Sequence, residues 1–345
     1  MDRGASLQRF AVVCVVLTLL TLVLYRYLAG PPVYADDGTS IIIEVPRNMR
    51  FDSLSKQLLR RDIIRDTGDF RRLAERLEYY QNPVRSGRFA VASGSSMHEL
   101  IQILHKGKQA PVNLIFTTER ELKDVAVKAD RFLELQASEL EQLFQDSLFL
   151  DSIGYNRHEL MTLFIPNTYE VYWNITPRDL VKRMITEHDR FWSKNSRWKK
   201  AEDLDLSPKE VYTLASIIER ETIKNDEKQR MAGVYYNRIQ QDMKLQADPT
   251  AVFASRDFNT SRVTNYHLKF DSPYNTYRYK GLPPGPITMA SIASIDAVLE
   301  LEEHSYIFFC ARGDGSGYHN FAETLKEHKQ NAAQYRKNRR ARRKG

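Results

Sequence analysis

The N-terminal segment is the most apolar part of the chain. Residues 10–25 read FAVVCVVLTLLTLVLY and contain no charged side chain. Extended to Ala29, with only Arg26 interrupting it, the run has about 20 residues, which is the length that a helix needs to cross a bilayer. The pattern predicts a transmembrane helix within residues 1–30, followed by a short polar linker at 31–39.

Basic residues around this run predict its orientation. Arg3 and Arg9 precede it, and after Arg26 the next Lys or Arg is Arg47. Because short cytoplasmic segments are rich in Lys and Arg, we expect the N-terminus in the cytoplasm and the body of the chain outside. A cleaved signal peptide is the alternative, since the residues at 33–35 resemble a cleavage site. The body is exported in either case.

Residues 40–109 alternate between strand and helix patterns. β-Branched and other apolar residues form two short runs, and apolar residues at helical spacing lie between and after them. The prediction is a compact unit of a strand, two helices, a strand and a third helix, at 40–45, 51–60, 67–79 and 87–92 and after a cap at Ser95 or Ser96.

Residues 110–335 combine many helices with a few strands. The whole pattern predicts an α+β protein, with a transmembrane helix, a small membrane-proximal subdomain and a mixed α/β region whose densest part is 207–330. The elements expected before that part are a strand at 110–116, a helix capped by Thr117 or Thr118, helices within 137–163, an extended segment at 163–173 and a helix at 177–194.

A helix that begins at Pro208 carries candidate chemistry. Ser207 is a good N-cap, and Glu210 completes a capping box. At about 100° per residue, Glu219 and Glu221 flank opposite edges of the apolar stripe, so at most one of them faces a cleft. Partial desolvation at that edge would raise the pKa of Glu219, as a general acid needs. The alternative is a solvated, charged helix end.

Charge and cysteine content restrict the possible functions. The last ten residues, 336–345, hold seven Lys or Arg and no acid, which accounts for the whole formal net charge of +7. Nucleic acid is therefore not an expected partner, and the basic tail is expected to be a solvated helix end. The two cysteines lie far apart and the eight histidines lack ligand spacing. No disulfide, metal or cofactor is predicted.

Three later segments are rich in turn-forming and polar residues. The segment KLQADPT at 244–250 contains Gln246 and Asp248, and Asp248 is also a candidate helix N-cap. The segment DSPYNTYRYKGLPPGPI at 271–287 offers Tyr and Asn side chains of the kind that contact sugars, with a packed proline-rich loop as the alternative. The glycines of GDGSGYHNF at 313–321 match no phosphate-binding spacing, and they predict a hairpin turn.

These segments together resemble one protein family. ASIIERET, LQADPT, SPYNTYRYKGLPPGPI and SGYHNFAETLKEH occur in this order, and they resemble the YceG-like family of endolytic murein transglycosylases. The resemblance implies a LysM-like subdomain at 40–109 and a catalytic region at 110–335. It also implies an anchor in the bacterial inner membrane, and peptidoglycan strands and the wall-synthesis machinery as partners.

The resemblance assigns the chemistry to a single glutamate. The family's motif matches Ser216 to Thr222 and places the catalytic acid at Glu219 rather than Glu221. A glycoside hydrolase needs two carboxylates, whereas a transglycosylase acting on muramic acid can use the C6 hydroxyl of the sugar as nucleophile. Cleavage of the MurNAc–GlcNAc β-1,4 bond would leave 1,6-anhydro ends and would terminate or trim nascent strands. The residues expected to hold the sugars are Gln246, Asp248, Asn275, Tyr277 and His319.

Two other functions stay open at this point. One is a membrane-anchored scaffold that binds peptidoglycan through the LysM-like subdomain without cleaving it. The other is a muramidase that uses Asp248 as the second carboxylate. The mass of the products distinguishes the three functions, because they yield anhydro ends, no cleavage and reducing ends, respectively.

Overall fold

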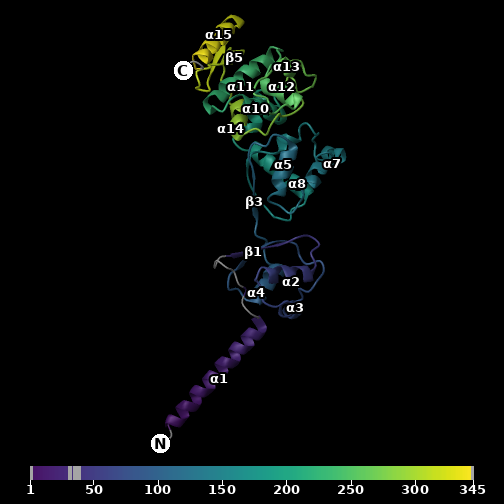
Figure 1. Cartoon of the computed structure of the whole chain (residues 1–345), viewed down its shortest axis with the longest axis vertical. Coiled ribbons are helices and arrows are strands. Elements are labelled where there is room, and N and C mark those ends of the chain that lie inside the picture. The colour runs from purple at the N-terminus through teal and green to yellow at the C-terminus, as the bar shows by residue number, and fades with distance from the viewer. Residues whose placement is uncertain (1–2, 30–32, 34–39, 343–345) are drawn as a thin grey trace. The chain divides into compact units, whose positions relative to one another are not determined.

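The computed structural model describes residues 3–29, 33 and 40–342, and in the first helix it describes the side chains of residues 10–24. The chain divides into two compact units (Figure 1). The predicted linker lies outside the described residues, except for Val33. Among the described residues, unit 1 comprises those up to 113 together with 132–134 and 170–175, and unit 2 comprises 114–131, 135–169 and 176–342.

Unit 1 has the predicted order of strands and helices. The two strands pair in antiparallel fashion, with Ile43 opposite Phe89. The third helix of the unit begins after Ser96, which forms a capping box with Glu99. The elements are α1 (Arg3–Ala29), β1 (Ser40–Val45), α2 (Phe51–Arg60), α3 (Thr67–Arg76), β2 (Gly87–Ala92) and α4 (Met97–Lys106).

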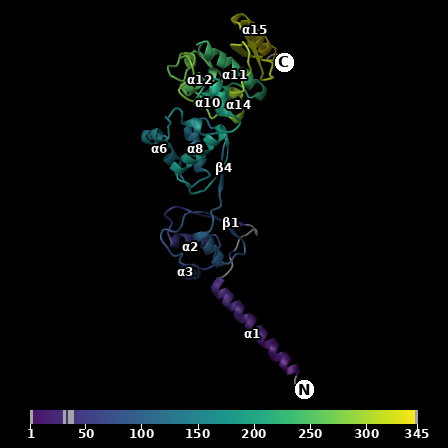
Figure 2. The ribbon, with the colours of Figure 1, turned by 180° about the vertical axis from the view of Figure 1, so that it is seen from behind.

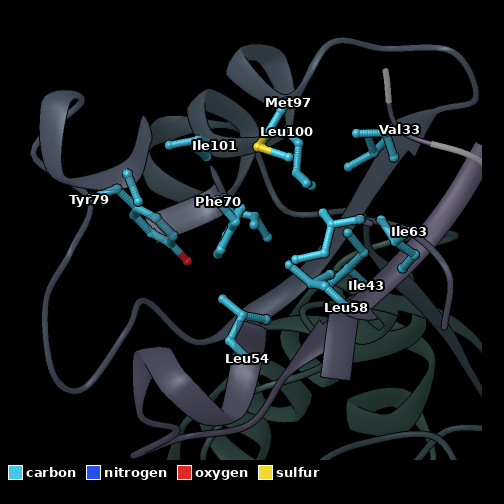
Figure 3. Close-up of a cluster of buried hydrophobic side chains, with 14 of the residues drawn as sticks. Val33, Ile43, Leu54, Leu58, Ile63, Phe70, Tyr79, Met97, Leu100 and Ile101 are labelled. Atoms are coloured by element: carbon cyan, nitrogen blue, oxygen red, sulfur yellow. The ribbon is translucent and has the colours of Figure 1, made fainter. Parts of the chain in front are cut away.

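A hydrophobic core of its own stabilises unit 1. Figure 3 shows side chains from β1, α2, α3 and α4 turned toward one another. Phe51 and Phe70 stack with their ring centroids 5.2 Å apart, and Ile43, Leu54 and Leu58 have almost no exposed surface. Burial of one such side chain contributes about 1.5–3 kcal/mol. The strands and helices of this small unit are therefore held by one shared core.

The helix α1 covers the apolar run that the sequence predicts to span a membrane. Its described side chains are exposed, including Phe10 and Leu17, which keep 71% and 56% of their surface accessible. Over the residues that the structure describes, no helix has the length and apolar character needed to cross a membrane. The transmembrane helix stays a prediction from the sequence.

Unit 2 is built mainly from helices, and the described residues form two small sheets besides the β1–β2 pair. β3 pairs with β4, and β5 pairs with β6 in antiparallel fashion. These pairings give the mixed α+β class that the sequence predicts. The elements after unit 1's α4 are β3 (Val112–Phe116), α5 (Leu122–Asp130), α6 (Ala137–Leu143), α7 (Ser147–Ser152), the 3-10 helix η1 (Leu160–Leu163), β4 (Asn167–Val171), α8 (Pro177–Trp192), α9 (Arg197–Asp203), α10 (Pro208–Glu221), α11 (Asn225–Gln240), α12 (Asp248–Ser255), α13 (Asn265–Lys269), α14 (Ile292–Leu299), β5 (Phe308–Ala311), β6 (His319–Ala322) and α15 (Leu325–Arg342).

The start of α5 differs from the prediction of a threonine cap. The hydroxyl of Thr117 donates to Glu119 in the preceding loop, at 3.1 Å. Glu121 is the N-cap instead, and its backbone N–H donates to Asp124 at 2.9 Å. The carboxylate of Glu119 binds the Thr117 hydroxyl, and the carboxylate of Asp124 binds the backbone N–H of Glu121. The helix therefore begins about four residues later than a threonine cap predicts.

The core of unit 2 surrounds α10. In both views α10, α11, α12 and α14 lie together (Figure 1 and Figure 2). Tyr212, Leu214 and Ile218 of α10 are fully buried, and Met231 of α11 and Ile295 of α14 belong to the same cluster. This packing fixes the C-terminal end of α10, where Glu219 and Glu221 lie.

The basic tail is helical as far as the structure describes it. Its residues up to Arg342 belong to α15, which has no buried side chain. Asn338 nevertheless donates a hydrogen bond to the carbonyl of Arg312 at 2.7 Å. Residues 343–345 lie outside the described part.

Candidate active site

The local structure predicted for α10 is confirmed. The hydroxyl of Ser207 and the carboxylate of Glu210 form the capping box, with Pro208 as the first helical residue. The helix ends at Glu221, and Thr222 is the C-cap. Because the apolar stripe is buried, the two glutamates at its edges meet different neighbours.

Glu219 is bound by groups from two other helices. Its Oε2 accepts hydrogen bonds from the hydroxyls of Ser291 at 2.5 Å and Ser294 at 2.6 Å. The ammonium group of Lys228, on α11, lies 3.3 Å from the same oxygen. Lys228 keeps only 5% of its side-chain surface exposed. Glu219 therefore neutralises a buried lysine and ties α10 to α11 and α14.

These contacts stabilise the charged form of Glu219. Burial by itself would raise the pKa of Glu219, but the hydroxyls of Ser291 and Ser294 and the charge of Lys228 outweigh it and hold the pKa below its usual value. The expectation that desolvation raises this pKa is therefore wrong. A carboxylate with a lowered pKa is a poor proton donor near neutral pH.

Glu221 has the opposite electrostatic environment. The hydroxyl of Tyr235 donates to its Oε1 at 2.7 Å. Although Glu221 keeps some exposed surface, the protein packed around it raises its pKa to about 7; the Tyr235 hydrogen bond lowers this pKa, and the negative charge of Asp248 raises it further. Glu221 is thus a mixture of acid and carboxylate at neutral pH.

A pocket of about 260 Å³ opens beside Glu221. Its wall also contains Asp248 and two arginines, Arg120 and Arg220. The apolar side chains of the wall include that of Ile287, the last residue of the proline-rich segment at 271–287. Of Glu219 and Glu221, Glu221 is the one that lines this pocket. The pocket therefore joins a carboxyl group of raised pKa to a second carboxylate and two cations.

Two of the predicted substrate residues meet at this pocket. The hydroxyl of Tyr277 donates to Asp248 Oδ1 at 2.6 Å. Burial and the neighbouring Asp248 raise the pKa of Tyr277, so its hydroxyl stays neutral. Asp248 is the first residue of α12, and Ala247 is the N-cap, so the capping role considered for Asp248 is wrong. The structure thus brings Asp248 and Tyr277 together near Glu221.

The prediction that Asn275 holds sugars is wrong. Its side chain is fully buried. The amide nitrogen lies within hydrogen-bond distance of the carbonyls of His267, Leu268 and Phe270, and its oxygen accepts from the backbone N–H of Tyr277. Asn275 therefore fixes the proline-rich loop and has no surface to offer a substrate.

We expect Asn275→Ala to lower the free energy of unfolding by about 2 kcal/mol, because the variant leaves buried carbonyl groups without a hydrogen-bond donor and nothing then offsets their loss of hydration. Urea denaturation of the full chain measures this. Gln246→Ala is the matched control: Gln246 is exposed, and its loss is expected to change stability little. Equal stabilities of the Asn275 variant and the control would contradict the role assigned to Asn275.

Neither of the two remaining predicted residues contacts Glu221 or Asp248. His319, on β6, places Nδ1 3.0 Å from the buried carboxylate of Glu227 on α11. That His319 also holds the sugar stays a prediction. Gln246 is exposed, with its Oε1 3.4 Å from Arg238. Among the described residues, no group of three His, Cys, Asp or Glu side chains is placed to hold a metal ion.

Sequence reasoning missed the partners that separate the two glutamates. Lys228 and Tyr235 lie on α11, and Ser291 directly precedes α14. Ser291 carries one local signal, because it is the N-cap of α14. No pattern along the chain shows that this cap also binds Glu219.

A carboxyl group of pKa about 7 on a pocket wall is typical of an enzyme that works by acid–base catalysis. The chain belongs to the YceG-like family, whose sequence profile matches residues 43–334. The resemblance seen in the sequence is thereby confirmed.

Known proteins align with half or more of the chain. An endolytic murein transglycosylase of Bacillus subtilis (strain 168) is 28% identical over 328 residues, which are 88% of this chain and 87% of that protein. One of Streptococcus pneumoniae (strain D39) is 28% identical over 184 residues, or 52% of this chain and 33% of that protein. A crystal structure of a YceG-like protein from Listeria monocytogenes has a TM-score of 0.56 and 25% identity, and covers 85% of this chain and 99% of that one.

Proposed function

We propose that this protein is an endolytic murein transglycosylase, which cleaves the MurNAc–GlcNAc β-1,4 bond within peptidoglycan strands and leaves 1,6-anhydro ends. The observation that carries the proposal is the carboxyl group of Glu221, with its pKa of about 7, on the wall of a pocket. The activity named for the relatives from Bacillus subtilis and Streptococcus pneumoniae supports it.

We assign the proton transfers to Glu221. In its acid form Glu221 protonates the glycosidic oxygen, and the C1–O4 bond breaks. The C6 hydroxyl of the muramic acid then attacks C1 and gives its proton to the Glu221 carboxylate. One bond forms, one breaks, the glutamate regains its proton, and no water is consumed. A general acid and base of this kind works best when its pKa lies near the working pH.

This assignment replaces Glu219, to which the motif resemblance gave the role. Two observations support the change. Glu221 lines the pocket and has a raised pKa, whereas Glu219 is held as a carboxylate by Lys228 and two serine hydroxyls. Tyr235 occupies Oε1 of Glu221, which leaves Oε2 to carry the proton to the substrate.

We expect the rate constant kcat/KM for strand cleavage to fall as the pH rises through about 7, because only the protonated form of Glu221 can begin the reaction. Asp248→Asn removes a negative charge that raises the pKa of Glu221, so the fall is expected at lower pH in this variant. Initial rates measured on both sides of neutrality test both points. A profile that is flat across neutral pH would contradict them.

Asp248 also makes a muramidase the second candidate function, because it shares the pocket with Glu221. A hydrolase that needs both carboxylates would lose most of its activity in Asp248→Asn, whereas the transglycosylase keeps its activity at a shifted pH.

Mass analysis of the products tests the proposed reaction. Purified glycan strands are incubated with the full-length protein in detergent, and the masses of the new ends are measured. We expect 1,6-anhydro ends. Reducing ends, which are heavier by one water molecule, would favour the muramidase. Uncut strands would favour the non-catalytic scaffold.

For unit 1 we propose a LysM-like role in binding glycan strands near the membrane. Its strand–helix–helix–strand order and separate core support this. For the N-terminal segment we propose an anchor in the bacterial inner membrane, supported by the uncharged run at 10–25. A partner in the wall-synthesis machinery stays a prediction.

Proteolysis tests the predicted location. Because the body after residue 39 is expected outside the cytoplasmic membrane, protease added to intact spheroplasts should degrade it and leave a cytoplasmic marker protein whole. Full protection of the body until the membrane is lysed would contradict this orientation.

A further inference from the structure

A second and larger hollow of about 520 Å³ lies next to the pocket at Glu221. The two hollows share Arg120 and Phe253 in their walls. The larger one is lined by residues from the start of α5, from the segment before η1 and from the end of α12. Its volume is in the range of pockets that bind small ligands. A substrate group next to the bond at Glu221 can therefore extend into it.

Three arginines in these walls are not used in ion pairs. Over the described part of the chain, no carboxylate lies within ion-pair distance of Arg120, Arg157 or Arg220. Other arginines of unit 2 are paired, such as Arg197 with Asp296 at 2.7 Å and Arg256 with Glu121. Positive charge is thus left available where the hollows open.

Arg120 and Arg220 are held in position near Glu221. The guanidinium group of Arg120 lies 4.5 Å from the ring centroid of Phe258, so its flat face is covered while its N–H edge can bind. Arg220 directly precedes Glu221 at the end of α10. Burial, and then the charge of Arg120, lower the pKa of Arg220, so the two guanidinium groups sense each other across the pocket. A bound anion would relieve this repulsion.

The substrate carries suitable anions on one of its two sugars. N-acetylglucosamine is neutral, whereas the lactyl group of muramic acid bears a peptide with free carboxylates. A guanidinium group matches a carboxylate through two parallel hydrogen bonds. The walls also contain the acidic side chains of Glu141 and Asp248. This mixture of signs suits a peptide better than a phosphate polymer, which the acids would repel.

We propose that Arg120 and Arg220 bind a carboxylate of the peptide on the muramic acid whose bond is cleaved, with the larger hollow holding the rest of that peptide. The proposal rests on the proposed function, because it takes peptidoglycan as the substrate. Peptide-bearing strands are then preferred to strands from which the peptides have been removed.

Binding to a fragment that cannot be cleaved tests this without turnover. The GlcNAc–MurNAc disaccharide lacks the MurNAc–GlcNAc bond, so its affinity for the full-length protein in detergent can be measured by calorimetry. Two probes are compared, the disaccharide with its peptide and the same disaccharide with its lactyl group capped as the methylamide, since amidase cleavage would leave a free lactyl carboxylate in place of the peptide. Arg120→Gln and Arg220→Gln are each expected to weaken binding of the peptide-bearing probe about tenfold, since each removes hydrogen bonds to a charged group. The affinity for the peptide-free probe should stay unchanged.

Matched variants separate this role from a structural one. Arg190→Gln removes the same charge from α8, away from both hollows, and should change neither affinity. Arg120→Lys keeps the charge without the planar guanidinium group, so it should weaken binding of the peptide-bearing probe by less than Arg120→Gln does. Added inorganic phosphate should compete weakly.

Any of three results would overturn the proposal. The first is equal affinity of the wild-type protein for both probes, and the second is an equal loss for both probes in the arginine variants. Strong competition by inorganic phosphate would likewise point to a phosphate ligand instead. Failure of the proposed cleavage has a different signature, because strands without 1,6-anhydro ends would refute the reaction while leaving the difference between the two probes intact.

Discussion

The Glu221→Gln variant is expected to cleave glycan strands at least about 10³-fold more slowly than the wild type. General acids and bases contribute about 10²–10⁴-fold, and here one carboxyl group makes both proton transfers. Glutamine can still accept the hydrogen bond from Tyr235, so the shape of the site is kept. Initial rates of release of 1,6-anhydro ends measure the loss. A variant within tenfold of the wild type would contradict the role of Glu221.

The stability of this variant provides the control. The pKa of Glu221 rises on folding from 4.5 to about 7, so the folded state binds more protons than the unfolded state between these values. The free energy of unfolding contributed by Glu221 is therefore greatest below pH 4.5 and falls as the pH rises to about 7. Glutamine removes this dependence, and the variant should be at least as stable as the wild type above neutral pH. A loss of folding would mean that the activity measurement does not report on catalysis.

Removal of Glu219 is expected to have the largest effect on stability. Glu219→Leu leaves the ammonium group of Lys228, with 5% of its side chain exposed, without its carboxylate. Removing one partner of a buried ion pair lowers the free energy of unfolding by about 3–5 kcal/mol. Folding lowers the pKa of Glu219, so its carboxylate stabilises the folded state at pH values above the ordinary pKa of a glutamate. This contribution disappears as the pH falls through the folded-state pKa. It is the contribution that Glu219→Leu removes. Urea denaturation at neutral pH measures it.

A double variant separates the ion pair from simple packing. Glu219→Leu combined with Lys228→Met removes both charges, and replacing both partners of a buried pair by apolar groups is often neutral. The double variant should therefore regain most of the stability that the single variant loses. If the double variant is less stable than Glu219→Leu, the pairing of Glu219 with Lys228 is not what holds these helices together.

The sequence predicts the local structure of the site well. Ser207, Pro208 and Glu210 locate the start of α10, and helical spacing places Glu219 and Glu221 at different edges of a buried stripe. The strand–helix–helix–strand order of unit 1 follows from apolar spacing in the same way. Such features depend on neighbours within a few residues, and the pattern along the chain records those neighbours.

The roles of the two glutamates depend on residues that are distant in the sequence. Ser291 lies 72 residues after Glu219, and its hydroxyl helps to keep that carboxylate charged. Tyr235 and Asp248 set the environment of Glu221 from α11 and α12. Desolvation and charge act through space, so a short motif cannot show which glutamate has the raised pKa.

Asn275 illustrates the same limit in the proline-rich loop. Its residue type suits sugar binding, and its neighbours in the sequence are turn-forming. The carbonyls that its amide meets belong to His267, Leu268 and Phe270, at the end of α13 and just beyond it. A buried asparagine of this kind stabilises a loop, and only the tertiary contacts distinguish it from an exposed one.

The rates of Glu219→Gln and Glu221→Gln on one batch of glycan strands test the central claim most directly. Both changes replace a carboxyl group by an amide and leave the number of non-hydrogen side-chain atoms unchanged. With both proteins checked to be folded, we expect Glu219→Gln to release 1,6-anhydro ends at least about 10²-fold faster than Glu221→Gln, since only the latter lacks the acid and base. An active Glu221→Gln beside an inactive, folded Glu219→Gln would contradict the assignment and return the catalytic role to Glu219.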